Sequence, residues 1–157
     1  MNIVTIEPFY FVGLAVRTTN ENGQAALDMG TLWKQFLSKN LISQIPNPLD
    51  STLHCLYTDY EQDHTKPYTA LLGCKVRSLD HVPEGFVGKT VAGGTYGVFK
   101  TAGKLSEGIV YQQWLRIWNT NLNRNYTTDF EVYTTNNPED EVVAIYIALN
   151  DSARTDL

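Results

Sequence analysis

The residues DFEVY, 129–133, alternate between polar and apolar, as in a β-strand that turns one face toward a core. Phe130 and Val132 share one side of such a strand, and Glu131 lies on the other. The later stretch VVAIYIAL, 142–149, is apolar on both sides, which predicts a strand with two covered faces. If these two strands pair, the carboxylate of Glu131 is shielded from open water.

Hydrophobic periodicity divides the first half of the chain into strand, helix, strand and strand. A strand is predicted over 8–18, and a helix around 24–40, where apolar residues fall near one another on a helical wheel. Two more strands, over 52–61 and 68–76, flank a turn at 62–67 and therefore predict a hairpin.

The second half shows the same order of elements. Residues 83–103 form a strand region whose glycine-rich middle, VAGGTYG, lacks the Gly-Lys-Ser/Thr ending of a phosphate loop. These glycines indicate a bulge or a close approach of two backbones. A helix is predicted over 104–122, with Ser106 as its candidate N-cap, and a hairpin follows from strands at 129–134 and 141–149.

The two halves align, faintly in letters but consistently in the order of elements. HCLYT falls on FEVYT, so that Cys55 corresponds to Glu131 and Tyr57 to Tyr133. An internal repeat constrains architecture strongly. We predict an α+β fold in which two β-α-β-β units join edge to edge in one curved antiparallel sheet, with two helices around a central groove and pseudo-twofold symmetry.

Length and composition fit one such domain. The chain has 157 residues, of which 43% are hydrophobic, and this is enough apolar material for a core. We predict a single domain over 1–150, built of repeats at about 3–80 and 83–150, and a flexible tail over 151–157.

Charge and hydropathy argue against several classes of protein. The net charge of −5 and the lack of a Lys/Arg cluster disfavour direct nucleic-acid binding. The apolar run FYFVGLAV is too short to cross a membrane, and no signal peptide is recognisable at the start. We therefore expect a cytoplasmic protein with no membrane or nucleic-acid partner.

The reactive side chains give no sign of a metal or a cofactor. Cys55 and Cys74 are the only cysteines, and His54, His64 and His81 lack metal-ligand spacing. The cysteines fall roughly opposite each other in the predicted hairpin, and in a reducing cytosol we expect two buried free thiols. The acidic turn DYEQDH lacks calcium-loop spacing and is predicted to be solvated surface.

Four segments together resemble the GyrI-like, or effector-binding, domain family: GVFKTAG, YQQWLRIW, DFEVY and VVAIYIAL. The similarity covers nearly all of 3–149 and is strongest over 95–149. This family includes the small-molecule modules of multidrug-responsive transcription regulators and stand-alone proteins, some from integron gene cassettes. Its fold is the duplicated unit predicted above. No helix-turn-helix pattern is seen, so the chain resembles the sensor without the DNA-binding part.

The resemblance also implies a site. Family members often carry an acidic residue at the centre of the pocket, in an F-E-x-Y strand, and Glu131 holds that position here. A Trp-Leu-Pro segment commonly precedes this strand, but the matching stretch 119–126 is NTNLNRNY, which changes one wall of the expected pocket.

The chemistry of Glu131 points to a cationic ligand. A buried carboxylate without a partner is costly and has a raised pKa, and a cation beside it recovers much of this cost. Aromatic faces add cation–π contacts of about 0.5–2 kcal/mol each. We predict a groove that binds lipophilic, cationic aromatic small molecules at Glu131. The other candidate ligand-binding residues are Trp33, Phe36, Tyr57, Tyr111, Trp114, Trp118 and Tyr133.

Alternatives stay open from the residues alone. Glu131 can hydrogen-bond a neighbouring Tyr or Trp and only fix sheet packing, and an aromatic stripe on a helix is often core. The chain can also be a protein-interaction module of the gyrase-inhibitor type, or can pass its ligand state to a separate transcription regulator. A buried glutamate can act as general base in a small-molecule hydrolase, although no Ser-His-Asp or Cys-His arrangement supports an enzyme.

Overall fold

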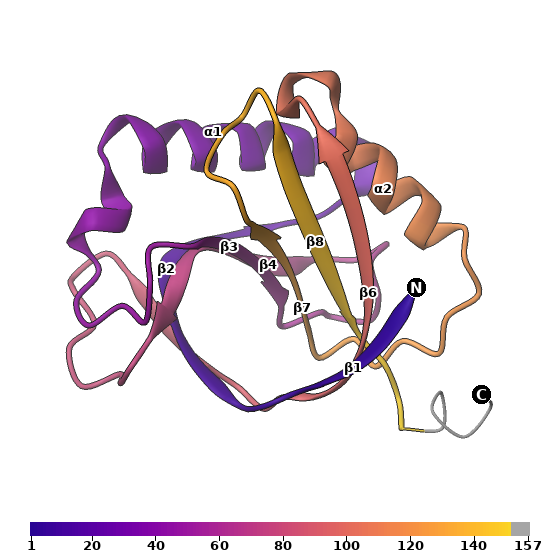
Figure 1. The fold of residues 1–157 in the computed structure, drawn as a ribbon, viewed down its shortest axis with the longest axis horizontal. Coiled ribbons are helices and arrows are strands. Elements are labelled where there is room, and N and C mark those ends of the chain that lie inside the picture. The colour runs from indigo at the N-terminus through magenta and orange to yellow at the C-terminus, as the bar shows by residue number, and fades with distance from the viewer. Residues whose placement is uncertain (152–157) are drawn as a thin grey trace.

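The computed structural model describes residues 1–151, which form one curved antiparallel sheet with both α-helices on the same side (Figure 1). The elements are β1 (Asn2–Ile6), β2 (Phe9–Thr18), α1 (Gln24–Ser38), β3 (Leu53–Thr58), β4 (Tyr68–Val76), β5 (Val87–Val91), β6 (Gly94–Gly103), α2 (Ile109–Trp118), β7 (Thr128–Tyr133) and β8 (Glu141–Ala148). No helix in this range is long and apolar enough to cross a membrane. The tail predicted over 151–157 lies outside the described residues, apart from Asp151.

The strand order joins the two predicted repeats at a central seam. The order is β1-β6-β8-β7-β3-β4-β2-β5, and β7 pairs antiparallel with β3. Strands β6, β8 and β7 belong to the second repeat, and β3, β4 and β2 belong to the first. Cys55 pairs with Glu131 across the seam, so the pseudo-twofold axis passes between two positions that the repeat alignment matched. The predicted α+β architecture is confirmed.

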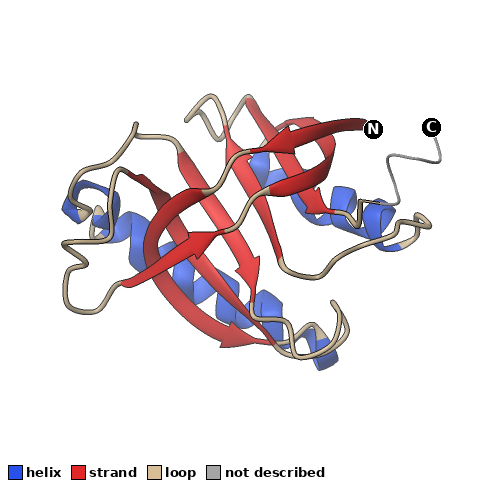
Figure 2. Cartoon of the chain, turned by 90° about the horizontal axis from the view of Figure 1, so that it is seen from below, coloured by secondary structure: helices blue, strands red, loops and turns tan. Residues whose placement is uncertain are grey.

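The outermost strands exchange between the two halves. β1 leads into β2 but pairs with β6, whereas β5 leads into β6 but pairs with β2. The two connections run beside each other in the view from below (Figure 2). A Cβ on Gly93 would lie 2.4 Å from the carbonyl oxygen of Ile6, so only glycine, here at φ +81°, fits at this crossing. The predicted close approach of two backbones is confirmed.

Two strand boundaries differ from the prediction because the exchange is a tertiary feature. The first strand was predicted over 8–18, which matches β2, but the separate strand β1 was missed. Region 83–103 was predicted as one strand region and contains two strands, β5 and β6. β1 and β5 are five residues each and are held by partners in the opposite repeat, which local alternation does not reveal.

The second helix is shorter than predicted. α2 follows Gly108, which is left-handed at φ +70°, and the residues before it form a separate 3-10 turn. Ser106 is therefore not the N-cap of α2. The helix ends at Trp118, and the chain then returns to the sheet, where Arg124 forms an isolated bridge with Leu149. A left-handed residue interrupts helical hydrogen bonding, which explains the late start.

Apolar residues cover both faces of the sheet. One cluster lies between the sheet and the helices and includes Phe36 and Ile145, and a second, which includes Phe11 and Phe130, lies on the opposite face. β8 contributes to both clusters, as its apolar pattern predicted. On β7, Phe130 belongs to the second cluster while Glu131 faces the helices, so the alternation predicted for this strand is confirmed.

The β3–β4 hairpin holds both cysteines as buried free thiols, as predicted. Its register pairs Cys55 with Leu72, so Cys74 lies two residues further along β4 and not opposite Cys55. The sequence predicted the hairpin but could not fix its register to the residue.

Candidate ligand-binding site

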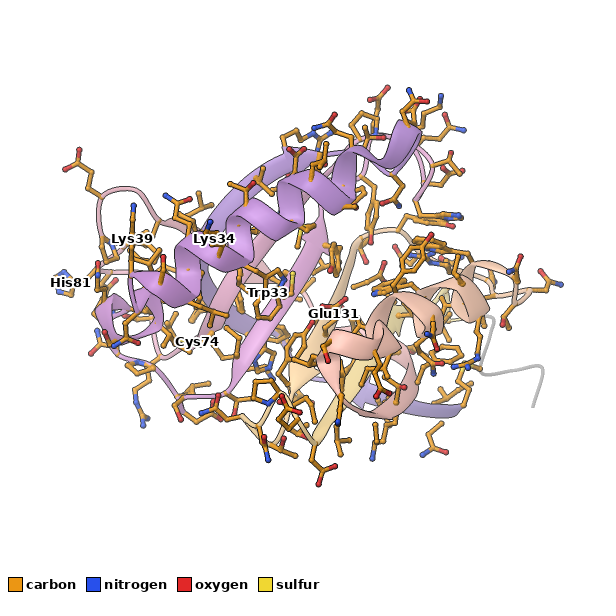
Figure 3. The ribbon with its side chains drawn as sticks, turned by 90° about the horizontal axis from the view of Figure 1, so that it is seen from above. Trp33, Lys34, Lys39, Cys74, His81 and Glu131 are labelled. Atoms are coloured by element: carbon orange, nitrogen blue, oxygen red, sulfur yellow. The ribbon has the colours of Figure 1, made fainter. Side chains whose placement is uncertain are left out.

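A cavity of about 310 Å³ lies on the helix side of the sheet, over the seam between β3 and β7. Both helices, both seam strands and the loops after β3 and α2 contribute to its walls. Glu131 lies in the space between α1 and α2, and Trp33 lies beside it on the α1 side (Figure 3). Seven of the eight predicted site residues line the cavity: Trp33, Tyr57, Tyr111, Trp114, Trp118, Glu131 and Tyr133.

Glu131 is 2% exposed and accepts hydrogen bonds from three neutral donors. The Tyr133 hydroxyl donates to Oε1 at 2.6 Å, while Trp114 Nε1 and the Tyr57 hydroxyl donate to Oε2 at 2.6 and 2.9 Å. These donors come from β7, α2 and β3, so the carboxylate ties the two repeats together. None of the ion pairs within residues 1–151 involves Glu131.

Burial sets the proton equilibria of this cluster. Desolvation raises the pKa of Glu131 above its ordinary value, and the hydrogen bonds from its three donors oppose part of that rise. Burial also raises the pKa of Tyr57 and of Tyr133 well above the usual value, so both hydroxyls keep their protons and donate. The cavity therefore contains a desolvated acid whose charged form is oriented by neutral donors.

Aromatic rings form a continuous wall along α2 and across to the β3–β4 loop. Trp114 packs edge-on against Tyr57 with ring centroids 5.4 Å apart. Trp118, one helical turn further on, lies 6.1 Å from Trp114 and stacks on His64 at 5.3 Å with 7° between the rings. Burial lowers the pKa of His64, which keeps its imidazole neutral at pH 7. This wall offers π faces from the carboxylate to the loop side of the cavity.

A second buried carboxylate lies two residues earlier on the same face of β7. Asp129 is 0% exposed and accepts hydrogen bonds from Arg124 Nη2 at 2.8 Å, the Tyr60 hydroxyl at 2.6 Å and the backbone N–H of Ala148 at 2.7 Å. The Arg124 guanidinium also lies over the Tyr126 ring, 4.3 Å from its centroid. Unlike the first carboxylate, this one has its counter-charge within the chain.

Phe36 is the predicted site residue that does not line the cavity. It is buried in the core between the helices and the sheet. The cavity-facing stripe of α1 ends at Trp33, and Phe36 lies nearly one turn further toward the C-terminus of the helix. The ligand contacts of the other seven residues stay predictions.

Sequence reasoning also missed part of the wall. Tyr60 and His64 line the cavity, although the segment DYEQDH was predicted to be solvated surface. Of its three acidic residues, Asp59 and Glu61 are exposed and Asp63 is half-buried. Arg124 lines the cavity from the segment that departs from the family pattern. Loop side chains carry no periodic signal, because loop closure sets their direction.

Residues 2–149 match the family model of Cass2, the integron-associated effector binding protein. The chain therefore belongs to this family of effector-binding, that is small-molecule-binding, proteins. The resemblance to effector-binding domains of the integron-cassette type is confirmed.

Three relatives illustrate the similarity. YobU of Bacillus subtilis (strain 168), whose name classes it provisionally as a transcriptional regulator, is 32% identical over 148 residues, which cover 88% of this chain and 91% of YobU. The crystal structure of the integron cassette protein VCH_CASS2, from the mobile metagenome of Vibrio cholerae, is 30% identical, covers 95% of each chain and has a TM-score of 0.75. The structure of SAV2435 bound to tetraphenylphosphonium is 14% identical, covers 98% of this chain and 95% of SAV2435, and has a TM-score of 0.79; this likeness shows the fold alone.

Proposed function

We propose that the protein is a receptor for lipophilic cations with aromatic groups, which bind in the cavity over the seam with Glu131 as their counter-charge. One observation carries the proposal. The buried carboxylate of Glu131 lines the cavity, accepts hydrogen bonds from neutral donors, and has no basic partner in any ion pair of residues 1–151.

The electrostatics favour a cation that sheds water easily. Folding already desolvates Glu131, so an incoming positive charge gains Coulomb energy in a medium of low dielectric without a further cost on the protein side. Its three donors hold the carboxylate in place, which limits reorganisation on binding. A strongly hydrated ion would still lose its own hydration shell. A cation with its charge spread over apolar groups loses much less, and is therefore preferred.

The cavity walls favour aromatic ligands of modest size. Rings of Trp33, Tyr57, Trp114 and Trp118 border the cavity, and each face that meets a cation contributes about 0.5–2 kcal/mol. A volume of about 310 Å³ is at the lower end of the range, roughly 300–1,000 Å³, that small-molecule sites occupy. Charge and π contacts are less directional than hydrogen bonds, so several ligand shapes are compatible with this site.

Titration with tetraphenylphosphonium, the ligand in the SAV2435 structure, tests the proposal. Trp33, Trp114 and Trp118 all line the cavity, so we expect a saturable change in tryptophan fluorescence. Glu131→Gln keeps the size and a carbonyl acceptor but removes the charge. We expect this variant to bind about tenfold to a hundredfold more weakly, as when one partner of a buried charge interaction is neutralised.

Glu139→Gln is the matched control. Glu139 lies in the β7–β8 turn with its side chain 77% exposed, and it does not line the cavity. This variant loses the same formal charge, and we expect it to keep the wild-type affinity. The absence of saturable binding to the wild type, or equal affinity in wild type and Glu131→Gln, would overturn the proposal.

A further inference from the structure

Three buried side-chain nitrogens have no hydrogen-bond partner among residues 1–151: Nε and Nη1 of Arg124, and Nε1 of Trp118. Both residues line the cavity. A buried donor without an acceptor is costly, and such atoms are rare in native proteins. All three belong to residues that border the same cavity, which points to an acceptor supplied from within it.

Arg124 cannot turn these donors elsewhere, because its guanidinium is held from two sides. Nη2 donates to Asp129 at 2.8 Å, and the guanidinium carbon lies 4.3 Å from the centroid of the Tyr126 ring. The side chain is only 5% exposed, and each of the three nitrogens is covered in the free protein, so a ligand oxygen reaches them only when the side chains that cover them move. Asp129 balances the charge. The single N–H of Nε and the two N–H bonds of Nη1 have no acceptor among residues 1–151.

Trp118 shows the same feature on α2. It lies one helical turn beyond Trp114, whose Nε1 donates to Glu131. Stacking on His64 at 5.3 Å holds the Trp118 ring in its orientation. Two indoles on one face of the helix thus differ: one N–H is bonded to the acid, and the other is unbonded within the described chain.

We infer that Arg124 and Trp118 form a second polar subsite in the cavity, which binds an acceptor oxygen of the ligand. The inference rests on the proposed function and deepens it. The ligand class becomes an aromatic cation that carries a carboxylate or carbonyl oxygen away from its positive centre. The cation lies at Glu131, and the oxygen lies at least one helical turn away, about 5.4 Å, where the donors are free.

Three phosphonium probes that differ in one group test the subsite. Carboxybutyl-triphenylphosphonium ends its alkyl chain in a carboxylate, its methyl ester offers a carbonyl, and pentyl-triphenylphosphonium ends in a methyl group. Calorimetric titration gives the Kd of each probe, and the ratio of pentyl to carboxybutyl Kd measures the acceptor preference. We expect a ratio of about ten or more in the wild type, with the ester in between, because hydrogen bonds to ionised groups are the stronger ones.

Two variants test whether Trp118 and Arg124 cause the preference for the carboxylate probe. Trp118→Phe keeps an aromatic ring for stacking but removes the N–H, and we expect the ratio to fall about threefold. Arg124→Met combined with Asp129→Asn removes both members of the ion pair, so that no buried charge is left unpaired, and we expect the ratio to approach one. Arg116→Met is the control, because Arg116 is an exposed arginine of α2 that does not line the cavity, and it should keep the wild-type ratio.

The outcomes separate this inference from the proposed function. If all three probes bind the wild type equally well, or if the ratio survives in Trp118→Phe and in the double variant, the subsite is wrong while the cation receptor stands. A fall of the ratio in Arg116→Met as well would assign the preference to surface charge and would also overturn the subsite. If no probe binds the wild type, the proposed function fails and the inference falls with it. Should the double variant not fold, Trp118→Phe decides.

Discussion

Two buried carboxylates share one face of β7, two residues apart, and their surroundings differ in one respect. Asp129 accepts hydrogen bonds from Arg124, Tyr60 and Ala148, and the arginine neutralises it. Glu131 also accepts three hydrogen bonds, but every donor is neutral. Both groups are removed from water, so the contrast lies in the counter-charge and not in burial.

This contrast separates Asp129, whose charge is part of an internal ion pair, from Glu131, whose charge is available to a bound cation. Asp129 already has a counter-charge in Arg124, so an external cation does not stabilise it further. This ion pair holds the segment after α2, which carries Arg124, against the sheet. An acid held only by neutral donors is oriented and desolvated but keeps an unmatched charge, which a cation from outside can satisfy. The same strand therefore contributes one group to the scaffold and one to the proposed site.

The pseudo-twofold axis sharpens the point, because it places matched positions of the two repeats in direct contact. Cys55 is the counterpart of Glu131 and pairs with it across the seam. A glutamate at both positions would bring two buried carboxylates together, and one of them would have to hold a proton. Because Cys55 carries a neutral thiol, Glu131 has no second carboxylate beside it at the seam.

The largest expected effect is on stability. Asp129→Asn leaves the Arg124 guanidinium buried beside a neutral amide, and we expect the free energy of unfolding to fall by about 3–5 kcal/mol. Glu131→Gln leaves no charge unpaired and should change it by less than about 1 kcal/mol. Urea unfolding followed by tryptophan fluorescence measures both. Equal losses in the two variants would show that Glu131 is as structural as Asp129.

The next largest effect is a pH dependence of cation affinity that arises from ionisation of Glu131. Its pKa is raised, so in the pH range from about 4.5 up to that raised pKa the free cavity holds a protonated acid, which a cation must deprotonate. Affinity for tetraphenylphosphonium should rise about tenfold per pH unit through this range and then level off. Tyr57, Tyr133 and Cys55 have raised pKa values and stay neutral there. His64, which also lines the cavity, gains a proton below its lowered pKa and weakens cation binding in the same direction.

Glu131→Gln is the control for this profile, because its affinity should keep only the smaller pH dependence that His64 contributes. Stability must be measured beside it, since the pKa of His54 is lowered by burial to about 4. The unfolded chain therefore binds a proton at His54 that the folded chain does not, so the contribution of His54 to stability rises with pH between about 4 and 6.5 in wild type and variant alike. In the wild type the raised pKa of Glu131 acts in the opposite direction, because its contribution falls as the pH rises from about 4.5 through that raised pKa. A binding profile as steep in the variant as in the wild type would assign the effect to His64 or another group.

The smallest expected effect isolates one donor. Trp114→Phe removes the N–H that donates to Oε2 of Glu131 and so destabilises the charged carboxylate. We expect the midpoint of the binding pH profile to move upward by roughly one pH unit. Trp33→Phe is the matched comparison, because Trp33 also lines the cavity but packs edge-on against Tyr133 at 5.0 Å and does not donate to Glu131. An equal shift in both variants would mean that cavity shape, not the hydrogen bond, controls the pKa.

Much of the fold was readable from local pattern. Alternation on β7 placed Glu131 on the side opposite Phe130, and the repeat of element order predicted the seam and the two helices. The family resemblance singled out Glu131 on this strand, and its side chain lines the cavity. These inferences succeed because strand alternation and helical periodicity depend on neighbours within a few residues, which the sequence lists in order.

The rest depended on contacts between distant parts of the chain. Nothing in the alternation of β7 distinguishes Asp129, which is neutralised, from Glu131, which is not, since both are acids on one face. The distinction arises because the segment after α2 brings Arg124 to Asp129 and not to Glu131. The exchange of β1 and β5 likewise follows from pairing between distant strands.

The sequence by itself determined that an acid would lie on the covered face of a central strand. Successive side chains of a strand point to opposite faces, so the position of Phe130 fixes the face on which Glu131 lies. Only the tertiary structure decided which acid is left without a counter-charge, because ion pairs form between side chains that folding, and not sequence order, makes neighbours.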